Sequence, residues 1–243
     1  MNTSEPVRTT ASDVALEVYL LGLVDFDAAL FLQERLMMDI AQSNNGRGAL
    51  LVCEHPPLIT VGREGSQADV RCEPHELTAR QIEVRWLNRG GGCLVHAPGQ
   101  LAAYPILPLE RRGCGLASYR DRLEHAMLDT CRELHVRAWR QPDGAGIFCR
   151  GGQVAYVGVA VRSGISSHGL FVNVNSRMDA MSLIRSGYRR ASSLAAERGL
   201  PVAMHSVRES LVRRLAARLE YGRFHLYTGH PLLRRTRRVV AYA

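Results

Sequence analysis

Apolar side chains repeat at helical spacing in three long stretches of the chain. Residues 25–43 carry this pattern and begin with two acidic residues, which predicts a helix with Asp25 or Asp27 near its N-cap. Residues 115–135 and 204–222 predict two further amphipathic helices. Alternating or continuously apolar runs predict strands at 13–22, 49–55, 82–88, 101–109 and 168–175, and a cluster of hairpins at 136–141, 146–151 and 153–164 with a turn at 142–146.

The order of these elements indicates the fold class. Strands follow one another in runs and do not alternate strictly with helices, so we expect an α+β fold with a mixed, mostly antiparallel sheet packed with helices. The 243 residues are enough for one substantial core. We expect a single domain over residues 13–230, a flexible N-terminal tail over 1–12 and a basic C-terminal tail over 231–243.

Charge and cysteine usage narrow the function. The formal net charge is +8, and all 31 basic residues are arginine, so the chain has no lysine amine for base or Schiff-base chemistry. The arginines are spread out except in the tail at 232–240, which argues against nucleic acid and favours acidic protein partners. Six scattered cysteines without a CxxC pair argue against a zinc site. No membrane span or signal peptide is expected, which suggests a cytoplasmic protein.

A run of three glycines is the clearest candidate for a ligand-binding loop. Gly90, Gly91 and Gly92 follow Arg89 between the strands predicted at 82–88 and 101–109. Glycines let a backbone approach a ligand closely. The stretch lacks both nucleotide-binding spacings, GxxxxGK[ST] and GxGxxG. A loop that closes over a slender ligand such as an acyl chain is the functional interpretation, and a plain wide turn is the alternative.

Three stretches of sequence, taken in order, resemble a known family. They are CEHPPLITVGR (53–63), RGGGCLVHAPGQLAAYPI (89–106) and SSHGLFVNVN (166–175). They resemble the signature blocks of the lipoyl(octanoyl) transferases, the octanoyl-[acyl carrier protein]:protein N-octanoyltransferases. The resemblance implies the fold of the biotin and lipoate protein ligase catalytic domains, with an acyl pocket under the glycine loop.

The resemblance also implies a mechanism and partners. Family members take octanoyl from acyl carrier protein onto a cysteine and pass it to a lysine of a lipoyl domain. The acceptors are lipoyl domains of 2-oxoacid dehydrogenase complexes or the glycine cleavage H protein. The thioester is already activated, so no cofactor or metal is implied. By matching position, the substrate-binding residues are Arg89, Gly90, Gly91, Gly92, Cys93, Leu94, Val95, His96, Tyr156, Val157, Gly158, His168, Gly169 and Leu170.

The sequence departs from the family at both catalytic positions. Gln153 stands where the family has the lysine that lowers the pKa of the cysteine, and Ser186 stands where it has the cysteine. Ser186 lies 18 positions after His168, as the cysteine does in the family, so the register is kept. Tyr156 is larger than the residue usual at its position and predicts a shortened pocket.

The remaining chemistry leaves several routes open. His168 or His96 could act as a base for Ser186. Cys93 or Cys149 could be a relocated nucleophile if Arg89 or Arg150 lowers its pKa, or both could be buried apolar groups. The acceptor lysine could also attack a bound thioester directly. The sequence therefore supports two hypotheses: an acyltransferase with altered chemistry, or a protein that binds acyl groups or lipoyl domains without transfer.

Overall fold

The computed structural model describes residues 14–43, 45–141, 144, 146–185 and 190–233. The predicted N-terminal tail and most of the predicted C-terminal tail lie outside these residues. The boundaries of the single domain therefore stay predictions.

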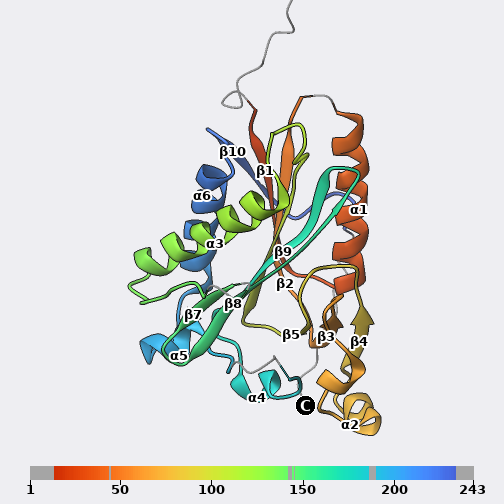
Figure 1. The fold of residues 1–243 in the computed structure, drawn as a ribbon, viewed down its shortest axis with the longest axis vertical. Coiled ribbons are helices and arrows are strands. Elements are labelled where there is room, and N and C mark those ends of the chain that lie inside the picture. Colours follow the sequence, from red (N-terminus) through yellow and green to blue (C-terminus); the bar gives the residue numbers. More distant parts are fainter. Residues whose placement is uncertain (1–13, 44, 142–143, 145, 186–189, 234–243) are drawn as a thin grey trace, which may run out of the picture.

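A seven-stranded mixed sheet forms the centre of the molecule (Figure 1). Its order is β10–β1–β2–β6–β9–β8–β7. The strands β10, β1 and β2 run parallel to one another, and every other adjacent pair is antiparallel. The bounds are β1 Leu16–Leu23, β2 Gly48–Glu54, β6 Gln100–Ile106, β7 Ile147–Cys149, β8 Gly152–Arg162, β9 Ile165–Asn173 and β10 Phe224–Thr228.

A second, three-stranded sheet lies at one end of the molecule, and short helices lie near it (Figure 1). Its order is β4–β3–β5, with β4 parallel and β5 antiparallel to β3. The bounds are β3 Leu58–Val61, β4 Glu83–Trp86, β5 Cys93–His96, α2 Pro74–Ala79 and α4 Met178–Met181, with a 3-10 turn at Gln67–Asp69. The remaining short helix, α5, spans Leu194–Arg198.

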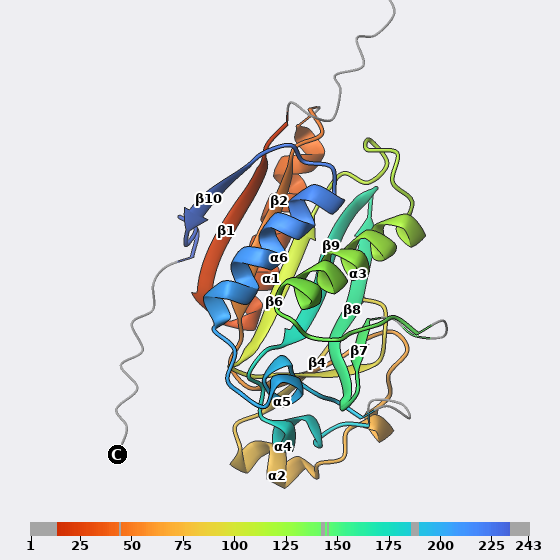
Figure 2. The same ribbon diagram turned by 90° about the vertical axis from the view of Figure 1, so that its left-hand side faces the viewer.

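Three long helices cover the two faces of the main sheet. Helix α1 (Phe26–Gln42) packs on one face, and α3 (Leu116–Glu133) and α6 (Met204–Arg218) lie side by side on the other (Figure 2). Each face buries its own apolar core, because apolar residues of α1 or of α3 and α6 pack against alternate residues of the strands. No helix among the described residues is long and apolar enough to cross a membrane.

The three predicted helices and the α+β class are confirmed. The cap of α1 is Asp25, whose Oδ1 accepts a hydrogen bond from the Ala28 N–H at 3.1 Å. Asp27 instead forms an ion pair with Arg85 of β4, at 2.9 Å. Asp25 and not Asp27 caps the helix, because only the Asp25 carboxylate accepts from a backbone N–H that has no partner within the helix.

The strand predictions are mixed. Strands are confirmed near 13–22, 49–55, 82–88, 101–109, 146–151, 153–164 and 168–175. The strand at 136–141 is wrong, because there only an isolated bridge joins Trp139 to Phe148. The turn at 142–146 falls largely outside the described residues. Strands β3, β5 and β10 were not predicted; β3 and β5 are four residues each, too short for a periodic signal.

Candidate functional site

The glycine loop connects β4 to β5 within the small sheet and contacts β8 of the main sheet. It runs from Asn88 to Gly92 and leads into β5, so it is shorter than the sequence indicated. The Gly90 N–H donates to the Val159 carbonyl of β8 at 2.9 Å, while the Gly62 N–H after β3 donates to the Gly92 carbonyl at 3.1 Å. The loop is thus held against β8 on one side and against the end of β3 on the other.

Arg89 anchors this loop from inside the protein. Its side chain is only 1% exposed, and Nη2 donates to the carbonyl and hydroxyl oxygens of Thr60 at 3.0 and 2.7 Å. Burial lowers its pKa to about 10, so the guanidinium stays charged at neutral pH. The guanidinium lies over Gly158, where an added Cβ would lie 3.3 Å from Arg89 Nη1. The Arg89 side chain can occupy this position because Gly158 has no side chain of its own.

A chain of buried hydrogen bonds continues from Arg89 through His96. The Thr60 hydroxyl lies 2.9 Å from His96 Nε2, and His96 Nδ1 lies 2.9 Å from Gln100 Oε1. The Gln100 amide N–H groups donate to the Val95 carbonyl and to Asn173 Oδ1, so its oxygen must face the imidazole. This network assigns the proton to Nδ1 and leaves Nε2 to accept from Thr60.

His96 is consequently a structural group and a poor candidate for a base. Both ring nitrogens are engaged, and burial together with the nearby His55 and Arg89 holds its pKa well below the usual range. The neutral ring orients Thr60 and Gln100. Neither ring nitrogen is free to take a proton in this arrangement, and a base role of His96 toward Ser186 stays a prediction.

His168 sits differently. It lies opposite Val159 in the β8–β9 ladder with a φ of 57°, a backbone region that non-glycine residues rarely adopt. Its Nδ1 is buried without a hydrogen-bond partner, and burial together with Arg89 lowers its pKa to about 4. The imidazole is neutral at pH 7 and has one nitrogen free to bind a ligand. Its role as a base stays a prediction.

Of the two proposed catalytic positions, Gln153 lies at the end of β8 that is far from the β8–β9 turn. Gln153 is buried, and its Nε2 donates to the Ala155 carbonyl at 3.2 Å. Its backbone N–H donates to the Arg190 carbonyl at 2.8 Å, so Gln153 flanks the segment that follows α4. Ser186 itself lies outside the described residues.

Of the two alternatives left open for Cys93 and Cys149, the structure favours buried apolar groups. Burial raises the pKa of Cys149 to about 12. Burial also raises the pKa of Cys93, and this effect exceeds the opposing influence of Arg89. Both thiols are buried and belong to apolar cores. They behave as small apolar groups and not as thiolate nucleophiles.

The other predicted binding residues divide between three cores. Tyr156 and Leu94 pack with Phe171 in the core that faces α1. Val157 and Leu170 point to the opposite face, under α3 and α6. Cys93 and Val95 belong to the core of the small sheet. The structure therefore brings together Arg89, Gly90, Gly158, His168 and Gly169, while Gly91 and Gly92 complete the loop.

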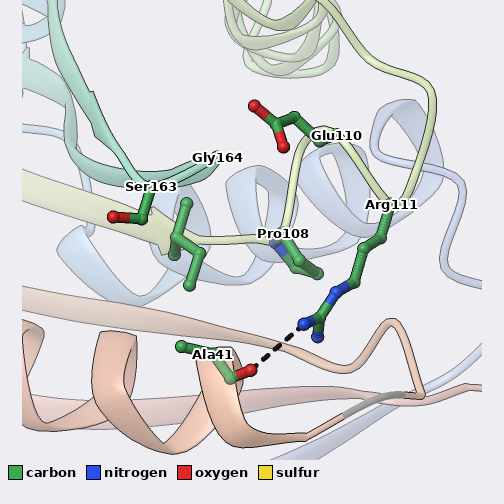
Figure 3. Close-up of a pocket in the computed structure, with 7 residues that line it drawn as sticks. Ala41, Pro108, Glu110, Arg111, Ser163 and Gly164 are labelled. Carbon is green, nitrogen blue, oxygen red and sulfur yellow. Dashed lines mark hydrogen bonds between the residues drawn. The ribbon is translucent and has the colours of Figure 1, made fainter.

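A described cavity of about 270 Å³ lies elsewhere (Figure 3). It sits at the β8–β9 turn, where the Arg111 Nη2 donates to the Ala41 carbonyl at 3.1 Å. Its lining residues are Ala41, Pro108, Glu110, Arg111, Ser163, Gly164 and Ile165. None of the predicted site residues lines it, so it is no candidate for the acyl pocket. Among the residues that the structure describes, no cluster of His, Cys, Asp and Glu is placed to hold a metal.

Sequence reasoning missed several polar residues of this region. Thr60, Gln100 and Asn173 are buried and carry the hydrogen-bond chain. Gln33 of α1 is also buried, and its Oε1 accepts from the His168 backbone N–H at 2.8 Å. The signal for Gln33 was present, since it is a lone polar residue on the apolar stripe of a helix.

The geometry can be compared with known proteins. Residues 25–217 match the model of the lipoyl protein ligase A/B catalytic domain. The chain belongs to this family. Curated relatives of the lipoyl protein ligase A/B family include the octanoyltransferase of Geobacter metallireducens, 36% identical over 214 residues, which span 87% of this chain and 97% of that one. Another is the octanoyltransferase of Geotalea uraniireducens, 37% identical over 68% of this chain and 73% of that one.

Solved structures of ligases share the fold of this chain. A putative lipoate protein ligase from T. acidophilum with bound lipoic acid superimposes with a TM-score of 0.70 at 15% identity, covering 90% of this chain and 91% of that one. The biotin protein ligase from Aquifex aeolicus in complex with biotin and ATP gives 0.52 at 17% identity over 84% and 70%. The predicted likeness to the lipoate and biotin ligase catalytic domains is confirmed at the level of fold.

Proposed function

We propose that this protein is an octanoyltransferase of protein lipoylation, acting in the cytoplasm. It moves an octanoyl group from acyl carrier protein to a lysine of a lipoyl domain, whether of a 2-oxoacid dehydrogenase complex or of the glycine cleavage H protein. The observation that carries the proposal is the glycine loop: Gly90 is bonded to Val159 of β8, which lies opposite His168, and the buried Arg89 side chain lies against Gly158. Family membership and the curated octanoyltransferase relatives support it.

The acyl chain would lie between the glycine loop and the α1-facing side of β8 and β9. Tyr156 occupies part of the core between the sheet and α1. We therefore expect a shallower acyl pocket than a smaller residue at this position would allow. Arg89 Nε is buried without a partner and is a donor for the acyl carbonyl oxygen. Residues 89–96, 156–158 and 168–170 stay the proposed binding residues, with Val157 and Leu170 contributing backbone only.

The chemistry cannot use the family's cysteine and lysine. In a direct transfer, the acceptor amine attacks the thioester carbonyl carbon, the C–N bond forms, the C–S bond breaks, and the pantetheine thiol leaves with the proton that the amine loses. Binding both substrates in register supplies much of the rate in such a reaction. The alternative is a two-step route through an octanoyl ester of Ser186. In that route Gln153 can neither accept the proton of the Ser186 hydroxyl nor supply a positive charge.

The test uses purified protein, octanoyl-acyl carrier protein and an apo lipoyl domain, weighed by intact mass spectrometry. A gain of one octanoyl group on the lipoyl domain, faster than in a mixture without the protein, supports the proposal. Loss of this gain in Ser186→Ala, with the exposed Ser182→Ala as matched control, selects the ester route, while retention selects direct transfer. No gain in a preparation that still binds octanoyl-acyl carrier protein contradicts the enzyme and leaves a binding protein.

A further inference from the structure

Gln33 is an exception on helix α1. The buried face of this helix is otherwise apolar, and Gln33 is its single buried polar residue among the described positions. It is 2% exposed. Burying a polar group is unfavourable unless it is hydrogen-bonded. Its Oε1 has a partner, the backbone N–H of His168, whereas its Nε2 has none. The contact with His168 is therefore the reason for a polar residue here.

The β6–β9 ladder does not supply a partner for the His168 N–H. The ladder ends at the pair Ala103 and Leu170, and two residues further its register would set Pro105 opposite His168. Proline has no N–H to donate to the His168 carbonyl, and the acceptor that the register offers to the His168 N–H is the Pro105 carbonyl. The Pro105 carbonyl accepts instead from the hydroxyl groups of Ser166 and Tyr119.

The glycine loop binds to the sheet at this same residue pair of β8 and β9. His168 lies opposite Val159, whose carbonyl accepts from the Gly90 N–H at 2.9 Å. One strand of the pair thus binds the loop, while the other binds α1 through Gln33. His168 keeps a φ of 57° at this point. A strained conformation of this kind persists only when the surroundings hold it.

We propose that Gln33 is a positioning residue of the acyl-binding site. Its amide oxygen holds the His168 backbone in the left-handed conformation, and this sets the imidazole and Gly169 against Arg89 and the glycine loop. The inference deepens the proposed function, since it assumes that this surface binds the acyl donor. The hydrogen bond itself can be tested without any transfer.

Three substitutions separate positioning from packing. Gln33→Met keeps the length and removes the acceptor, while Gln33→Asn keeps the amide but is one methylene too short to reach. Gln33→Glu keeps both reach and acceptor and is the rescue variant. Leu36→Met, one turn further along the same buried face, is the matched control for packing. Hydrogen exchange of the 165–171 peptide and the Kd for octanoyl-acyl carrier protein are measured on each folded variant.

Gln33→Met and Gln33→Asn are expected to lose exchange protection in the 165–171 peptide and to weaken donor binding at least tenfold. Gln33→Glu and Leu36→Met are expected to stay within threefold of the parent protein. In a transfer assay the KM for the acyl donor rises in the first pair, while that for the lipoyl domain is unchanged. If Gln33→Met and Gln33→Asn keep both protection and affinity, the inference is wrong. If the parent protein binds the donor but does not transfer octanoyl, the exchange and Kd results still decide it, and only the proposed function falls.

Discussion

At the scale of single residues, the site is defined by buried polar groups at the meeting point of the glycine loop, β8 and β9. Arg89, His96 and His168 were all expected there from the sequence motifs. What each one does depends on its hydrogen bonds. His96 has both ring nitrogens engaged, whereas His168 has a buried nitrogen without a partner. The two histidines, His96 and His168, therefore differ in what they can do, although each lies in a motif block of the same family.

Replacing Gly158 by alanine is expected to displace Arg89. The added Cβ would lie 2.9 Å from the Gly90 carbonyl oxygen and 3.3 Å from the Arg89 side chain. We expect a loss of about 1–3 kcal/mol in the free energy of unfolding, typical of overpacking, and at least tenfold weaker binding of octanoyl-acyl carrier protein. Urea unfolding and calorimetric titration measure the two. Gly115→Ala, where nothing lies within 4 Å, is the matched control; equal effects of both changes would refute the argument.

The buried thiols are expected to be inert in the folded protein. With a pKa of about 12, Cys149 has almost no thiolate at pH 7.5. Cys93 is buried as well, whereas Cys72 is half-buried. Iodoacetamide at pH 7.5 should therefore label Cys72 first and leave Cys93 and Cys149 unmodified, as read by peptide mass mapping. Labelling in guanidinium shows that all three can react. Early labelling of Cys93 would restore it as a candidate nucleophile.

At the scale of elements, helix α1 does two tasks. Its N-terminus is capped by Asp25, and its middle reaches the main sheet through Gln33. The helix packs against both β6 and β9. It therefore connects the stability of this face of the sheet to the position of the proposed acyl-binding residues.

Asp25→Ala should destabilise the protein more than Asp27→Ala. Asp25 accepts from the Ala28 N–H, and loss of such a cap costs about 1 kcal/mol. Asp27 is exposed and forms a surface ion pair with Arg85, an interaction typically worth about 0.2–1 kcal/mol and weakened by salt. Thermal unfolding of the two variants at low and high salt gives the comparison. A larger effect from Asp27→Ala would show that the ion pair, and not the cap, secures the start of α1.

At the scale of the whole molecule, three buried imidazoles make stability depend on pH. Burial lowers the pKa of His55 and of His168 to about 4, and holds that of His96 well below its usual range. The unfolded chain, with histidine pKa values near about 6.5, binds more protons than the folded one over this interval. Stability is therefore complete above about pH 6.5 and falls as the pH drops towards about 4.

The expected loss between pH 7.5 and pH 5 is about 2 kcal/mol for each of His55 and His168. Urea unfolding at pH 7.5, 6 and 5 measures it. The loss should persist in 0.5 M NaCl, because salt screens exposed ion pairs much more than buried groups. A urea midpoint that does not change over this range would contradict the assignment of neutral, buried imidazoles.

Local pattern was enough for the parts of this protein that depend on neighbours in the chain. The amphipathic spacing of α1, α3 and α6 predicted each of these helices, because apolar residues three and four positions apart meet on one face whatever the rest of the fold. The motif blocks around Arg89 and His168 likewise predicted the family. The sequence also excludes a catalytic lysine, because the chain has none. That Ser186 stands at the position of the family's cysteine stays a prediction.

Contacts between distant segments decided the rest. Only packing shows that Val157 and Leu170 face α3 and α6, that β3 and β5 form a second sheet, and that burial outweighs Arg89 in setting the pKa of Cys93. The bond from Gln33 to His168 joins residues 135 positions apart. Burial and hydrogen-bond partners come from the whole fold, so the protonation and orientation of the site residues were beyond the reach of the sequence alone.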